Sequence, residues 1–233
     1  MRKNLAIAAG ILTLSVALIL VFLTQILSSI GFHPHYERQD FDLAGRRALV
    51  IATNHDTLGD PADGVATGVY GSELTIPYYE FIDAGMTVDI ASVEGGEIPF
   101  EPVSLRWPLA SAADHRYLDD LDAQNRTASS LRIADIDVTQ YDIIFMAGGW
   151  GAAYDLGVSP ELGEKITQAH AADILLGSVC HGALGFLMAT DVDGSPLVEG
   201  RTMTGVTDKQ VDELGIDITP QHPERELRAQ GAN

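Results

Sequence analysis

Cys180 is the only cysteine in the chain, and a histidine follows it directly in the stretch GSVCHG, residues 177–182. A cysteine between small residues at the end of an apolar run has the small-x-nucleophile-x-Gly form of a sharp strand-to-helix turn. The helix expected next, over roughly residues 181–189, would direct its first backbone amides at the sulfur and favour the thiolate. The sequence therefore predicts a nucleophilic Cys180 with His181 beside it. The alternative is a buried cysteine that packs as a small hydrophobic residue.

Two other features can serve the same chemistry. The glycines of AGGWG, residues 147–151, follow another apolar run, and the N–H groups of Gly148 and Gly149 can stabilise a developing oxyanion. Glu73 stands near the expected start of a helix, where its side chain can reach the same crevice. A carboxyl group beside a thiolate is pushed towards its protonated form and can shuttle a proton. On spacing alone, the alternatives are an ordinary tight turn and a solvated acid.

These residues depend on alternating strands and helices to bring them together. Short apolar runs rich in branched residues predict buried strands, with helical segments between them. The strands are expected at residues 47–53, 86–92, 141–149 and 172–179, the helices at 72–85 and 159–172, and an inserted cap at 93–140. This alternation implies an α/β fold with a parallel sheet covered on both faces. Loops 54–73, 148–151 and 179–182 should meet at the carboxyl ends of the strands, where ligands bind such sheets.

Composition narrows the class of partner. The formal net charge is −19, and the acidic residues are spread along the sequence. This charge argues against nucleic acid and anionic lipid as partners of the main domain. One cysteine cannot form an intramolecular disulfide, and the histidines show no convincing metal triad. We therefore expect no metal site.

The first thirty residues differ from the rest of the chain. The uncharged stretch at residues 5–30 is long enough to cross a bilayer of about 30 Å as a helix, which predicts an uncleaved transmembrane anchor in contact with lipid. Arg2 and Lys3 precede it and favour a single-pass protein whose domain lies on the extracytoplasmic side. The expected organisation is an anchor at 1–30, a tether at 31–45 and a domain at 46–233.

Four motifs occur in order from about Arg47 onward: TGVYGSELTIPYYEFIDAG, YDIIFMAGGWGAAYDL, SVCHGALG and PLVEGRTMTGVTD. Together they resemble the ThiJ/PfpI family of the class I glutamine amidotransferase-like superfamily, and within it the heat-shock chaperones with glyoxalase III activity. The resemblance implies a flavodoxin-like parallel sheet sandwiched by helices, with a nucleophile elbow. Compared with the family pattern, the domain is expected to be shortened at its C-terminus. By position, it implies these roles: Cys180 as nucleophile, His181 as its imidazole neighbour, Glu73 as the acid at the sulfur, and Gly148 and Gly149 as the oxyanion turn.

The same resemblance implies an activity in stress protection. Members convert methylglyoxal to lactate without glutathione, through a hemithioacetal of the cysteine and a proton transfer between two carbons. That lyase scheme acts on small reactive aldehydes and needs no cofactor, and a homodimer is a further expectation. Two positions depart from the family pattern. Trp150 stands where close relatives often have histidine, and the acid that orients the histidine falls near residues 210–212, where Asp212 is the candidate.

Other interpretations stay open. His222-Pro223-Glu224 has the His-x-Glu form of a glutamine amidotransferase, but it lies too near Cys180 along the chain, and the elbow lacks Cys-x-Gly-x-Gln. A cysteine peptidase-like hydrolase is a second enzyme alternative. The alternatives without turnover are a holdase chaperone and a redox sensor, in which an exposed cysteine of low pKa is oxidised.

Overall fold

The structure is a computed structural model that describes residues 2–29 and 39–233, with the side chains of residues 2–9, 24 and 28 excepted. The chain divides into two compact units, Met1–Asp40 and Phe41–Asn233. The first unit contains one helix, α1 (Arg2–Ser29). The predicted tether lies largely in residues 30–38, outside the described part of the chain. The predicted boundaries at residues 30 and 45 stay predictions.

The membrane prediction is contradicted. A spanning helix needs about 20 consecutive, mainly apolar residues. Of the residues that the structure describes, no helix offers an apolar stretch long enough to cross a membrane. The predicted bilayer contact through residues 5–30 is therefore unsupported, and the single-pass location with an extracytoplasmic domain is wrong.

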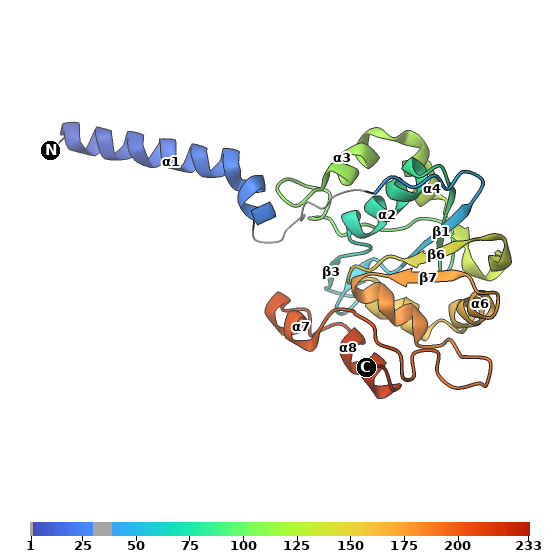
Figure 1. Cartoon of the computed structure of the whole chain (residues 1–233). Helices are drawn as coiled ribbons and strands as arrows, with labels where there is room; N and C mark the ends of the chain where they lie inside the picture. The colour runs from blue at the N-terminus through green and yellow to red at the C-terminus, as the bar shows by residue number, and fades with distance from the viewer. Residues whose placement is uncertain (1, 30–38) are drawn as a thin grey trace. The chain divides into compact units, whose positions relative to one another are not determined.

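The second unit is built on a five-stranded sheet in the order β5-β4-β1-β6-β7, in which every neighbouring pair is parallel (Figure 1). The strands are β1 (Arg47–Ala52), β4 (Thr87–Ser92), β5 (Leu131–Arg132), β6 (Ile143–Met146) and β7 (Leu175–Ser178). A separate antiparallel pair joins β2 (Thr57–Leu58) and β3 (Val65–Ala66). The four longer strands follow the order 2-1-3-4 that begins a flavodoxin-like sheet, and β5 adds an edge beyond β4.

Helices cover both faces of this sheet, as the alternation of elements predicts. The α-helices are α2 (Gly71–Asp83), α3 (Ala112–Asp119), α4 (Leu121–Ala128), α5 (Ala152–Asp155), α6 (Pro160–Ala171), α7 (Asp208–Leu214) and α8 (Pro223–Ala229). The 3₁₀ helices are η1 (Ile133–Asp135), η2 (Val138–Gln140), η3 (Leu156–Val158) and η4 (Cys180–Phe186). Ser159 caps α6 by accepting a hydrogen bond from the Leu162 N–H, and Pro160 occupies the first helical position.

The alternating side chains of β1 divide the interior into two cores. Leu49 and Ile51 pack on one face with residues of α6 and η4. Ala48, Val50 and Ala52 pack on the other face with residues of α2, α3 and α4. Successive side chains of a strand point to opposite faces, so a strand buried on both faces reads as a continuous apolar run. The α/β class and the parallel sheet are thereby confirmed.

Two local predictions differ from the structure. The predicted cap at 93–140 contains α3 and α4. It also contains the two-residue strand β5, which pairs with β4 at the edge of the sheet. The helix predicted at about 181–189 is the 3₁₀ helix η4. A 3₁₀ turn is tighter than an α-helix, which suits the sharp change of direction after β7.

Candidate active site

Cys180 lies at a strained turn between β7 and η4. Its φ of +56° is one of two positive values found for non-glycine residues in the described chain, and such strain is typical of functional positions. The turn closes with a hydrogen bond of 2.8 Å from the Gly182 N–H to the Val179 carbonyl. A side chain at position 182 would collide with the Met146 carbonyl, so only glycine fits. This is the geometry of a nucleophile elbow.

Glu73 comes from the first turn of α2 and reaches the same place. The start of α2 is fixed by a hydrogen bond of 2.9 Å from the Gly71 N–H to the Ser104 hydroxyl. The Oε2 atom of Glu73 is buried and has no hydrogen-bond partner of ordinary geometry. A Cβ atom at Gly148 would lie 2.5 Å from this oxygen and 2.8 Å from the Cys180 Cβ. The carboxyl group, the glycine turn and the cysteine therefore share one small volume.

Burial changes the acidity of Glu73. It raises the pKa of the carboxyl group from 4.5 to about 7, because a buried carboxylate loses its hydration. The Cys180 thiol and the backbone N–H groups of Gly148 and Gly149 act in the opposite direction without cancelling this effect. A carboxyl group that titrates near neutral pH can both accept and donate a proton.

The thiol does not have the lowered pKa that the sequence predicts. Burial and the charge of Glu73 raise the pKa of Cys180 well above its usual value, although the N–H groups of Gly149 and His181 oppose the rise. Trp150 and Cys180 pack against an apolar cluster of Val206, Val211 and Ile216. The expected amides are present, but burial and the charge of Glu73 outweigh them.

His181 lies beside the thiol but lacks an acidic partner. Its Nδ1 atom is 3.4 Å from the Cys180 sulfur, and its side chain is fully buried. Burial, with a smaller contribution from His222, lowers the pKa of the imidazole to about 4. The buried Nε2 atom has no hydrogen-bond partner. Asp212, the predicted orienting acid, is exposed on α7 and does not pair with His181; its neighbour Val211 is the residue buried in the apolar cluster.

The predicted oxyanion turn is held close to the start of α2. Gly149 has a φ of +94°, and a side chain there would collide with the backbone of Gly68 and Tyr70. Its N–H also interacts with the Cys180 sulfur. The turn thus presents backbone donors where a thiolate or an oxyanion would form.

Sequence reasoning missed several residues of the site. Val206 and Ile216 are distant from Cys180 in sequence, and their apolar character gave no functional signal. Tyr70, next to α2, is also part of the surroundings, since burial and then the charge of Glu73 raise its pKa. Only His222 carried a signal, as part of His222-Pro223-Glu224, and that motif pointed to a different enzyme class.

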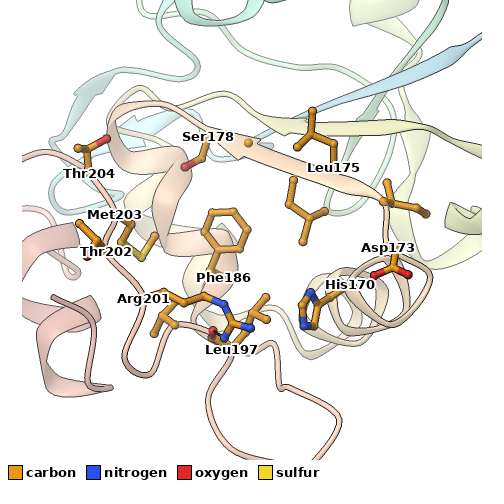
Figure 2. A pocket seen from close by; sticks show the side chains of 14 residues that line it. His170, Asp173, Leu175, Ser178, Phe186, Leu197, Arg201, Thr202, Met203 and Thr204 are labelled. Carbon is orange, nitrogen blue, oxygen red and sulfur yellow. Dashed lines mark hydrogen bonds between the residues drawn. The ribbon is translucent and has the colours of Figure 1, made fainter.

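A separate cavity of about 570 Å³ lies along the edge strand β7 (Figure 2). Phe186, Leu197 and Met203 line it, with Arg201 and His170 among the polar residues. It includes none of Cys180, His181 and Glu73 in its lining. Among the described residues, no group of three or more histidine, cysteine or acidic side chains could hold a metal ion. The candidate site is therefore defined by the elbow rather than by this cavity.

Curated relatives with sequence similarity are named as glyoxalases. The chain is 28% identical over 178 residues to the glutathione-independent glyoxalase HSP31 of Saccharomyces cerevisiae, covering 75% of this chain and 74% of that protein. It is 33% identical over 159 residues to the glutathione-independent glyoxalase hsp3101 of Schizosaccharomyces pombe, covering 67% and 63%. The chain thus spans less than two thirds of the second relative.

Solved structures share the fold. The Rapid Encystment Protein 24 KDa (REP24) of Francisella tularensis is 30% identical with a TM-score of 0.74, over 81% of this chain and 82% of that one. Glyoxalase III of Candida albicans has a TM-score of 0.72 at 23% identity, over 81% of each chain, which speaks for the fold alone. Residues 64–221, more than half of the sequence, match the DJ-1/PfpI family. The resemblance seen in the motifs is confirmed, and the chain belongs to the DJ-1/PfpI family.

Proposed function

We propose that this protein is a glutathione-independent glyoxalase of the glyoxalase III type, which converts methylglyoxal or a similar small reactive aldehyde to a hydroxy acid. Cys180 is the nucleophile, Glu73 and His181 handle protons, and the N–H groups of Gly148 and Gly149 stabilise negative charge. The names of the curated relatives support the reaction class. The observation that carries the proposal is the buried Glu73 carboxyl group, with a pKa of about 7, packed against a cysteine at a strained elbow.

The pKa values decide which group accepts the thiol proton. Because the pKa of Cys180 is raised, the resting enzyme holds a thiol, and the proton must leave as the sulfur attacks. His181, with a pKa of about 4, is a weak base, whereas Glu73, with a pKa of about 7, is a better one. Glu73 therefore takes the thiol proton while the sulfur bonds to the aldehyde carbon, and the aldehyde oxygen gains a proton to complete the hemithioacetal.

The remaining steps move one proton and add water. A base removes the hydrogen of the former aldehyde carbon, and the neighbouring carbonyl oxygen is protonated, which gives an enediol. Protonation of the second carbon, with loss of the hydroxyl proton from the sulfur-bearing carbon, then yields a thioester of the hydroxy acid on Cys180. Water hydrolyses this thioester, releasing the hydroxy acid and the thiol, so the net reaction consumes one aldehyde and one water. Glu73 can serve as base and then as acid because its pKa lies near neutral pH.

The raised pKa of Cys180 also weighs against a redox sensor. Oxidation of a sensor cysteine requires an accessible thiolate. Cys180 is only partly buried, but its raised pKa disfavours the thiolate that oxidation requires. A holdase function does not require this cysteine, so it should survive substitution of Cys180, whereas the glyoxalase activity should not.

A homodimer stays a prediction, which sedimentation of the purified chain checks.

The test is formation of lactate from methylglyoxal by the full chain, with Cys180→Ser as its matched variant. Lactate is measured as well as methylglyoxal loss, because methylglyoxal also reacts with protein side chains without turnover. We expect many turnovers by the wild type and none by Cys180→Ser. A folded wild type that forms no lactate, or a variant that forms it equally well, would contradict the proposal.

A further inference from the structure

His181 presents a buried nitrogen that needs a partner. Its side chain is fully buried, and its Nε2 atom has no hydrogen-bond partner in the described structure. Leaving a buried polar atom unpaired is unfavourable, so each such atom calls for an explanation. The Nδ1 atom faces the Cys180 sulfur at 3.4 Å. If Nδ1 accepts a hydrogen bond from the thiol, the neutral imidazole must carry its own proton on Nε2.

His222 has a buried nitrogen that lacks a hydrogen-bond donor. It immediately precedes α8 and is buried. Its Nε2 atom lies 3.1 Å from the Thr219 carbonyl oxygen, and because a carbonyl only accepts, Nε2 must carry the proton. The neutral ring then leaves Nδ1 as a bare acceptor. That Nδ1 atom is buried and also has no hydrogen-bond partner.

The fold places the two rings on elements that pack together. Helix α8 contacts η4, which contains His181. Gly205 lies between them: a Cβ atom there would be 3.2 Å from the Pro223 Cβ and 3.4 Å from the Ala183 Cβ. After burial, His222 is the second cause of the lowered pKa of His181. Each nitrogen lacks a direct partner, so the gap between them exceeds one hydrogen bond.

We propose that His222 is the positioning residue of His181, its Nδ1 atom accepting the Nε2–H of His181 through one bridging water. A single water satisfies two buried polar atoms that face each other across such a gap. His222 thereby takes the place of an orienting acid, which Asp212 does not supply because it is exposed. The inference rests on the proposed function for its consequence in catalysis, but not for its geometry.

Other charged groups nearby are already engaged or lie on the opposite side of the His181 ring. Glu73 and Cys180 lie on the Nδ1 side. Glu224, on α8, accepts hydrogen bonds from the Asp208 N–H at 2.9 Å and from Arg228 at 3.1 Å. A neutral acceptor at His222 fixes the tautomer of His181 without adding the negative charge that would raise its pKa. His181 then stays a weak base, which leaves Glu73 to take the thiol proton.

The test uses two variants that each keep one half of the His222 ring. In His222→Asn the amide can present an acceptor near the Nδ1 position, but the donor to Thr219 is lost. In His222→Gln the amide nitrogen can still reach Thr219, but the acceptor towards His181 is lost. The tautomer of His181 is read from ¹⁵N NMR of the full chain, with its signals assigned by comparison with His181→Asn. The kcat/KM for lactate formation is the second readout.

We expect the Nε2–H tautomer in the wild type and in His222→Asn, and a loss of this preference in His222→Gln. The kcat/KM should fall by about tenfold or more in His222→Gln and stay within about threefold in His222→Asn. An Nδ1–H tautomer in the wild type would overturn the proposal without any variant. So would a His181 tautomer that is the same in both folded variants. If the wild type forms no lactate, the proposed function fails, while the NMR result still decides the role of His222.

Discussion

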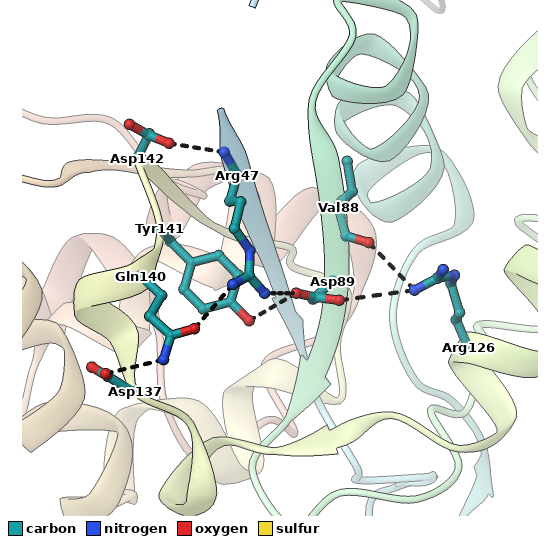
Figure 3. Close-up of polar contacts among 8 residues, drawn as sticks. All are labelled: Arg47, Val88, Asp89, Arg126, Asp137, Gln140, Tyr141 and Asp142. Carbon is teal, nitrogen blue, oxygen red and sulfur yellow. Dashed lines mark hydrogen bonds and ion pairs between the residues drawn. The ribbon is translucent and has the colours of Figure 1, made fainter. Parts of the chain in front are cut away.

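The two ends of the central sheet differ in how their charged side chains are paired. Towards the amino ends of the strands, Arg47 donates hydrogen bonds to Asp89 at 2.8 Å and to Gln140 at 3.0 Å, and Tyr141 donates to Asp89 at 2.9 Å (Figure 3). Asp142 accepts a hydrogen bond of 2.8 Å from the Arg47 backbone. Each carboxylate of this cluster has partners, and the Arg47 guanidinium also lies 4.8 Å from the centre of the Tyr141 ring.

At the carboxyl ends, three buried polar atoms of the candidate site lack a hydrogen-bond partner. The Oε2 atom of Glu73, the Nε2 atom of His181 and the Nδ1 atom of His222 are all without a hydrogen bond. Burial disfavours the ionised forms of Glu73 and His181, whereas the hydrogen bond to Asp89 raises the pKa of Arg47 and stabilises its charge. The polar cluster at the amino ends therefore stabilises the fold. The unpaired groups at the carboxyl ends destabilise it, but they can change protonation near neutral pH.

The largest expected effect is on activity at the carboxyl end. Cys180→Ser should lower kcat/KM for methylglyoxal by at least about 1,000-fold, because a hydroxyl is a far weaker nucleophile than a thiol. Stopped assays of lactate check this, with circular dichroism to show that the variant is folded. Asp89→Asn, at the other end of the sheet, serves as the control and should retain full activity per folded molecule.

Glu73→Gln should come next, with a loss of about 100-fold to 10,000-fold, the usual contribution of general acid–base catalysis. In the wild type, kcat/KM should rise as pH increases towards about 7 and then level off, because the Glu73–Cys180 pair must lose one proton before attack. The variant should lose this dependence. A wild-type profile that is flat from pH 5 to 8 would show that Glu73 does not take the thiol proton.

Glu73 and His181 should make the free energy of unfolding depend on pH in opposite directions. Burial raises the pKa of Glu73 from 4.5 to about 7, so this group contributes stability below pH 4.5 that is lost by about pH 7. Burial lowers the pKa of His181 from 6.5 to about 4, so this group contributes stability above pH 6.5 that is lost as pH falls towards 4. Between pH 4.5 and 6.5 the two effects oppose each other in the wild type.

Removing either group should expose the effect of the other. Relative to wild type, the free energy of unfolding of Glu73→Gln should rise with pH across this window, and that of His181→Asn should fall, each by up to about 3 kcal/mol. Urea unfolding at several pH values measures both slopes. Parallel changes in the two variants would contradict the assigned pKa directions.

The smallest expected effect is at the amino end. Asp89→Asn removes the carboxylate that Arg47 and Tyr141 share, and we expect it to lower the free energy of unfolding by about 1–2 kcal/mol. Because the cluster is partly exposed, solvent screens part of the loss. Thermal unfolding measures the change. A loss of activity per folded molecule in Asp89→Asn would mean that the two ends of the sheet are coupled.

The sequence predicts those features that local patterns determine. The apolar run at residues 47–52 predicted β1, which is almost entirely buried, and a second run predicted β7, whose residues are exposed or only partly buried. The small residues around Cys180 predicted the elbow, because only glycine avoids a collision at position 182. The two-residue strand β5 has too few residues to show a period. Long-range packing could not be predicted either, because Val206, Val211 and Ile216 pack against Cys180 from a distant part of the sequence. The sequence pattern singled out His222 as part of a motif, but it did not indicate that His222 lies near the element that contains His181.

The most direct test of the account is the titration of Glu73 itself. In protein labelled with ¹³C at glutamate carboxyl groups, the Glu73 resonance is identified by its loss in Glu73→Gln and followed from pH 4 to 9. We expect a midpoint near 7, in keeping with burial against the Cys180 thiol. A midpoint near 4.5, the ordinary value for glutamate, would contradict the claim that this end of the sheet holds a proton ready for transfer.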